Sequence, residues 1–126
     1  MRIAARQDET FEAEVADGFR ITIKALSASV YAECERLMME ATDQSYSPAR
    51  KHRAAQAYKR KCLEHGLVDW DGLVDQNDEQ VPMPVHGKNE SPNVAEIESL
   101  IPAVTLTGVV DRILSLSGLG PESLGN

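Results

Sequence analysis

The first pattern along the chain is an alternation of apolar and polar positions over residues 10–25, interrupted at residues 16–18. Phe11, Ala13 and Val15 alternate with glutamates, and a second apolar series alternates with charged or polar residues. A period of two predicts half-buried β-strands, so we expect a hairpin here. An isolated hairpin is not stable in water, so its apolar face should pack against helices. The second apolar series is Phe19, Ile21, Ile23 and Ala25.

The turn of this hairpin should lie at Asp17-Gly18. A regular two-residue turn would put apolar and polar side chains on the same face of the sheet. We therefore expect a three-residue loop, 16–18, with Val15 opposite Phe19 and Gly18 in the left-handed bulge position.

Helical spacing follows the hairpin. Ser27 is a suitable N-cap for a helix over 28–41, and Ser47-Pro48 has the composition that begins a helix over 48–65, which ends near Gly66. Met39 lies opposite the apolar stripe of the first helix and is either a contact residue or one exposed apolar side chain. The stripes comprise Val30, Tyr31, Cys34, Leu37, Met38 and Ala41 in the first helix and Ala54, Ala55, Tyr58 and Cys62 in the second.

The second helix carries most of the basic residues. Its lysines and arginines form either a solvated face that balances the acidic remainder or a docking face for an acidic partner. These residues are Arg50, Lys51, Arg53, Lys59, Arg60 and Lys61.

Two further helices are predicted near the C-terminus, over about 92–101 and 103–117, separated by Pro102. The apolar positions of the last helix cover roughly 160° of arc, which is wider than a simple surface helix needs. This helix is therefore either deeply buried or in contact with another chain, such as a second copy. Its apolar residues are Leu106, Val109, Val110, Ile113, Leu114 and Leu116.

These elements predict an α+β fold with an N-terminal β-hairpin packed on a mainly helical domain of about four helices. We expect one domain over 1–119 and a flexible tail over 120–126. The chain has 126 residues, of which 42% are hydrophobic and 5% aromatic, so the core should be mainly aliphatic.

The net charge of −7 and the pI near 4.9 argue against nucleic acid and anionic lipid as partners. No apolar run is long enough to cross a membrane, and the first residues have no apolar stretch typical of a secretion signal. We therefore expect a cytoplasmic protein with Cys34 and Cys62 reduced.

Residues 66–84, GLVDWDGLVDQNDEQVPMP, contain five acidic residues, no basic ones and the only tryptophan. A calcium-binding EF-hand loop starting at Asp69 or at Asp75 misplaces both the required glycine and the final glutamate. We therefore interpret the segment as an extended arm and a tight turn whose acids face water. Trp70 should pack at the join between the second helix and the C-terminal pair.

No other chemistry is indicated. A zinc site can be written from Cys34, His52, Cys62 and His65, but both cysteines fall in apolar stripes, where a thiol behaves as a small hydrophobe. Motifs of nucleotide-binding sites and of hydrolases are absent from the sequence. We predict no catalytic residues, no metal and no cofactor.

The order of these elements, together with the segment after the second helix, resembles the tail assembly chaperones of long-tailed bacteriophages and prophages. In that family a helix is followed by a W-x-G-v-x-d segment with later prolines, then by two helices. One turn glycine of the family is replaced here, so Asn77 or Asp78 must take the turn, and residues 85–90 and Pro102 are further departures. The matching residues are Trp70, Gly72, Val74, Asp75, Pro82 and Pro84.

The resemblance implies a non-enzymatic protein of the infected host's cytoplasm that binds the tape-measure protein, keeps it soluble and promotes tail-tube assembly. It also implies absence from the mature virion and, in many members, a longer frameshifted form that recruits tail-tube protein. Two alternatives remain: a structural tail-completion or connector component, and a small adaptor or metal-binding regulator. The candidate partner-binding residues are Met39, Leu106, Val110, Ile113 and Leu114.

Overall fold

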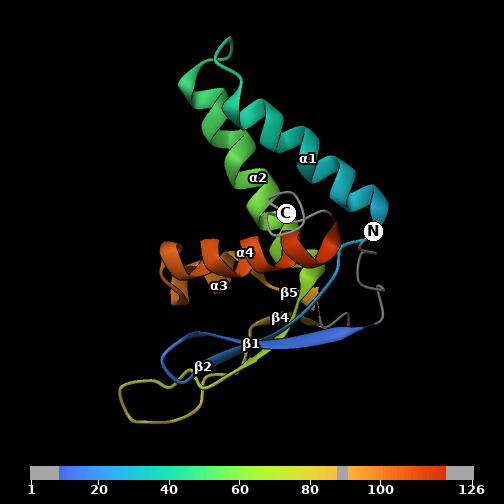
Figure 1. Cartoon of the computed structure of the whole chain (residues 1–126). Helices are drawn as coiled ribbons and strands as arrows, with labels where there is room; N and C mark the ends of the chain where they lie inside the picture. The colour runs from blue at the N-terminus through green and yellow to red at the C-terminus, as the bar shows by residue number, and fades with distance from the viewer. Residues whose placement is uncertain (1–8, 88–90, 119–126) are drawn as a thin grey trace.

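The computed structural model describes residues 9–87 and 91–118 and shows the α+β fold expected from the sequence (Figure 1). The predicted flexible tail, 120–126, lies outside the described residues. The elements are β1 (Thr10–Ala16), β2 (Phe19–Lys24), α1 (Ala28–Thr42), α2 (Pro48–Gly66), β3 (Leu67–Asp71), β4 (Val85–His86), β5 (Ser91–Pro92), α3 (Val94–Leu100) and α4 (Ala103–Ser117).

Three antiparallel strands form the main sheet in the order β1-β2-β3. Phe11 pairs with Ile23 and Ala13 with Ile21, as the alternation predicts. The third strand was predicted only as an extended arm. It returns from α2 and pairs with the free side of β2, so the hairpin becomes the first two strands of a three-stranded sheet.

The predicted pairing of Val15 with Phe19 is wrong. Ala16 pairs with Phe19 across a two-residue turn, and the register shifts between Glu14 and Ala16. This irregularity gives β1 one extra residue, Val15, which restores the apolar face without the longer loop that we expected. Gly18 has φ +76°, the left-handed conformation expected for it.

The helices α1 and α2 form an antiparallel hairpin that extends away from the sheet (Figure 1). The predicted N-caps are confirmed: the hydroxyls of Ser27 and Ser47 accept hydrogen bonds from the backbone N–H groups of Val30 and Arg50. Each helix ends one residue beyond its predicted limit. Local capping signals therefore placed the helix starts correctly, because they depend only on neighbouring residues.

The third helix is shorter than predicted. Residues 91–92 form β5, which pairs with β4, and α3 begins at Val94. Asn93 is the N-cap, and its side-chain oxygen accepts a hydrogen bond from the N–H of Glu96 at 3.2 Å. Ser91-Pro92 therefore forms a short strand, and Asn93, not Ser91, is the N-cap of the helix that follows.

The core lies between the sheet and α4, which crosses above it (Figure 1). From α4, Val110 and Ile113 are at most 1% exposed, and Val109 is 2% exposed. From the sheet, Ile21 and Ile23 are at most 2% exposed. The wide apolar arc of the last helix is therefore mostly intramolecular.

A candidate docking groove between helices

A groove of about 290 Å³ lies between α2, α4 and the end of α3. Buried Leu63, Ile101 and Val110 form its floor, and exposed His52 and Ala103 stand at its rim. This volume is at the lower end of the range for small-molecule pockets, so it suits a few side chains of a partner. The complete lining is His52, Gln56, Lys59, Leu63, Glu98, Ile101, Ala103, Leu106, Thr107 and Val110.

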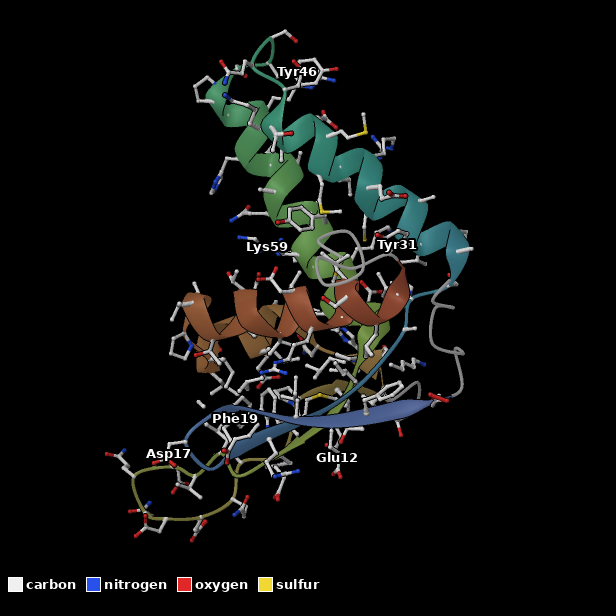
Figure 2. The ribbon with its side chains drawn as sticks, in the orientation of Figure 1. Glu12, Asp17, Phe19, Tyr31, Tyr46 and Lys59 are labelled. Atoms are coloured by element: carbon white, nitrogen blue, oxygen red, sulfur yellow. The ribbon has the colours of Figure 1, made fainter. Side chains whose placement is uncertain are left out.

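Helical periodicity places one side of this groove on a single face of α2. His52, Gln56, Lys59 and Leu63 follow one another at four-, three- and four-residue intervals, which brings them into line. Figure 2 labels Lys59 along the part of α2 that approaches α4. The apolar end of this face is buried at Leu63, and its polar end is open to solvent.

The other side of the groove belongs to the first half of α4. Ala103, Leu106, Thr107 and Val110 again have helical spacing. Leu106 is half-buried, so part of its apolar surface remains accessible. Just outside the groove, the side chain of Val104 is 81% exposed. The start of α4 thus presents more apolar surface than its deeply buried centre.

Opposite charges flank the groove. Glu98 of α3 forms an ion pair with Arg60 at 3.0 Å, whereas Lys59 has no ion-pair partner within the described residues. An ammonium group at the edge of an apolar groove can attract an acidic residue of a partner without being buried itself. The groove therefore favours an apolar segment that carries an acidic group nearby.

The structure separates the residues predicted to bind a partner. Leu106 is in the groove wall, and Leu114 is half-buried against the core. Val110 and Ile113 are core residues, so they offer almost no surface to a partner. The prediction did not separate the buried part of the wide apolar arc from its accessible part. Met39 is 72% exposed, but on α1 and outside the groove lining.

Met39 belongs to a second surface, near the tip of the α1–α2 hairpin. There Arg50 donates to Glu40 at 2.7 Å, and its guanidinium lies 3.6 Å from the ring centre of Tyr46. Tyr46 is at the tip in Figure 2. The side-chain hydrogen bond to Glu40 raises the pKa of Arg50. These polar contacts hold the tip together and leave Met39 as its exposed apolar residue.

Trp70 has a structural position in the sheet. It lies in β3, opposite Ile21 of β2, and not at the join between helices that we predicted. The ring is 7% exposed and meets Phe19 edge-on, with 5.6 Å between the ring centres. Its indole N–H donates to the carbonyl of Val81 at 2.8 Å. The tryptophan therefore fastens the returning acidic loop to the sheet.

Gly72 follows Trp70 by two positions, and only glycine fits there. Its φ is +91°, and a Cβ at this position would lie 1.8 Å from the carbonyl oxygen of Gly18. The backbone of the acidic segment thus passes directly against the turn of the β1–β2 hairpin. This close approach explains the glycine of the W-x-G pattern in physical terms.

Asp75 organises the next turn. Its Oδ1 accepts hydrogen bonds from the N–H groups of Asn77 at 2.8 Å and Glu79 at 3.1 Å. Asp78 takes the left-handed conformation with φ +61°, so of the two candidates, Asn77 and Asp78, it is Asp78 that takes the turn. The five acids of the segment are exposed. Pro82, another residue of the pattern on which the resemblance rests, is exposed as well.

The two cysteines lie at the contact between α1 and α2. Cys34 and Cys62 are fully buried, with their sulfur atoms 3.8 Å apart. Their hydrogen bond lowers the pKa of Cys34 and raises that of Cys62. Across residues 9–87 and 91–118, no three histidine, cysteine or acidic side chains gather in a cluster that could hold a metal ion.

Sequence reasoning missed most of the groove, including His52, Gln56 and Ile101. The aligned spacing along α2 was visible in the sequence, but only the fold shows that this face turns toward α4.

Within the described part of the chain, no helix combines the length and apolarity needed to cross a bilayer. Searches against protein-family models, curated proteins and solved structures find no match to this chain.

Proposed function

We propose that this chain is a non-enzymatic tail assembly chaperone that binds the tape-measure protein of a long-tailed phage or prophage. It keeps this client soluble in the host cytoplasm, promotes assembly of the tail tube and is absent from the mature virion. The resemblance carried by Trp70, Gly72 and Asp75 supports this proposal. A longer frameshifted form would recruit the tail-tube protein.

The observation that carries the proposal is the groove between α2 and α4. A client helix presents apolar side chains at three- and four-residue intervals, and such a row can enter a groove between two helices. Burial of one leucine or valine side chain contributes about 1.5–3 kcal/mol, and this gain must offset the translational and rotational freedom lost on association. A few apolar side chains in this groove, together with an ionic contact at its edge, therefore favour a weak and reversible complex.

The charge of the chain supports the same role. A net charge of −7 opposes self-association while some apolar surface remains accessible. Lys59 at the groove would select client segments that carry an acidic residue beside their apolar row. A chaperone needs this combination of general solubility and local apolar surface.

The proposal is tested by co-expressing the chain with the tape-measure protein of the same genome. We expect a higher soluble yield of tape-measure protein and a complex on size-exclusion chromatography. Unchanged solubility together with no complex would refute the proposal. Detection of the chain in purified virions by mass spectrometry would instead favour a structural tail component.

A matched pair of variants tests the groove. Ala103→Glu puts a carboxylate at the groove rim, in the first turn of α4, where negative charge does not destabilise a helix. Val104→Glu makes the same change at the next position, which is 81% exposed and outside the groove lining. We expect only Ala103→Glu to reduce client solubilisation. Met39→Glu tests the α1 surface, and a loss confined to this variant would place the client there.

A further inference from the structure

The inner face of the main sheet is covered unevenly. In β2, Ile21 and Ile23 are at most 2% exposed. In β1, the side chains on the same face, Phe11, Ala13 and Val15, are only half-buried, although they pack against the same core. One border of the apolar sheet face therefore stays partly open to solvent.

The open border is also an open edge for hydrogen bonding. In the described part of the chain β1 pairs only with β2, and it is the outermost strand (Figure 1). An outer strand directs about half of its backbone N–H and C=O groups away from the sheet. At the opposite border, the loop after β3 lies against the sheet, where Val81 accepts the hydrogen bond of Trp70.

A groove continues the open border toward α4. It has a volume of about 340 Å³ and is lined by apolar side chains of the strands and by two charged residues of α4, Asp111 and Arg112. A strand added beside β1 would direct every second side chain toward this groove and cover the half-buried apolar residues. The lining consists of Phe11, Glu12, Ala13, Ile23, Asp111, Arg112, Ser115 and Leu116.

Charge on the outer face of β1 selects the partner. Glu12 and Glu14 are both exposed, and Figure 2 shows Glu12 on the side of the sheet away from α4. In a symmetric antiparallel pairing of two copies about Ala13, each Glu12 would lie opposite a Glu14. Like charges directly opposite one another destabilise a strand pair, so this geometry disfavours a second copy.

We propose that the free edge of β1 binds an extended segment of a partner protein by strand addition. The segment alternates basic residues, which lie beside Glu12 and Glu14, with apolar residues, which cover Phe11 and Ala13. Backbone hydrogen bonds supply affinity, and the alternate side chains supply selectivity. This surface is separate from the groove between α2 and α4 and requires no helical client.

The probe is a short peptide of alternating lysine and valine, and its control has glutamate in place of lysine. We expect the lysine peptide to bind about tenfold more tightly, because two opposite-charge pairs replace two like-charge pairs. Hydrogen exchange should slow at those amides of Thr10–Ala16 that are not bonded to β2. Equal binding of both peptides, or protection confined to other elements, would overturn the proposal.

Charge reversal gives the decisive comparison. The double variant Glu12→Lys and Glu14→Lys changes exposed side chains, but it removes the hydrogen bond from the Gly18 N–H to Glu14 and places a lysine opposite Arg20. Circular dichroism and a thermal melt therefore first establish that the variant is folded. Its preference should invert, with the glutamate peptide bound about tenfold more tightly than the lysine peptide. An unchanged preference, or a stable dimer of the wild-type chain through β1 on sedimentation, would refute the assignment. Neither result depends on the tape-measure experiment.

Discussion

Replacement of Trp70 tests how the acidic segment is attached to the sheet. Trp70→Ala removes a ring that is 7% exposed, its edge-on contact with Phe19 and its hydrogen bond to Val81. Trp70→Phe keeps an aromatic ring but removes the indole donor. The two variants therefore separate packing from hydrogen bonding.

The expected loss of unfolding free energy follows from these contacts. Truncation of a buried tryptophan to alanine costs about 3–5 kcal/mol, a range that includes the cavity left behind. Trp70→Phe should cost about 1–3 kcal/mol, because Val81 loses its donor and the smaller ring fills less space. A domain is stable by about 5–15 kcal/mol, so Trp70→Ala removes a large share of that stability.

The assay is urea denaturation followed by far-ultraviolet circular dichroism, since both variants lose the only tryptophan fluorophore. Val68→Ala is the matched control, because this neighbour in β3 is 38% exposed and should cost less than about 1 kcal/mol. A loss below about 1 kcal/mol for Trp70→Ala, with an unchanged denaturant slope, would contradict the packing argument. Loss of client binding at full stability would make Trp70 a contact residue.

Three further outcomes are expected. Gly72→Ala should destabilise the fold by at least about 2 kcal/mol, because Gly72 has a φ of +91° and its backbone lies against Gly18. Gly108→Ala is the control: a methyl group there would meet open space within α4, so this change should stabilise the fold by up to about 1 kcal/mol. Thermal melts compare the two variants, and equal shifts in melting temperature would contradict the geometry. Asp75→Ala should speed hydrogen exchange at the amides of Asn77 and Glu79, because these amides lose the carboxylate that accepts their hydrogen bonds. Asp71→Ala is the control and should leave both exchange rates unchanged, because the Asp71 side chain accepts neither bond. Burial, and to a smaller extent the nearby Asp111, raise the pKa of Tyr58 in the folded chain. Tyr58 therefore contributes fully to stability below its pKa in the unfolded chain, near 10.0, and this contribution is lost as the pH rises through its pKa in the folded chain. Over this alkaline range the free energy of unfolding should fall less in Tyr58→Phe than in the wild-type chain.

Local patterns in the sequence determined the identity of most elements. Alternation identified β1 and β2, and the spacing of apolar residues identified the helices. The serines at 27 and 47 placed two helix starts, because a cap satisfies backbone groups only a few residues away. The turn chemistry of Asp75 and Asp78 was likewise readable, since it involves one short segment.

Pairing between distant segments was decided only by the tertiary structure. Leu67–Asp71 contains residues that favour a strand, including valine and tryptophan. It forms β3 only because one edge of β2 is free to pair with it. The register shift between Glu14 and Ala16 is likewise a property of the paired strands β1 and β2. Strand pairing and register are long-range properties, so a single strand's composition does not contain them.

The candidate sites show the same division. The sequence determined that the last helix has too wide an apolar arc for a simple surface helix. Only the fold assigned Val110 and Ile113 to the core and left Leu106 at a groove wall. Among residues 9–87 and 91–118, the fold also leaves the outer edge of β1 unpaired while it covers β2 on both sides. Periodicity along one element shows which side chains share a face, but the neighbours that cover that face come from elsewhere in the chain.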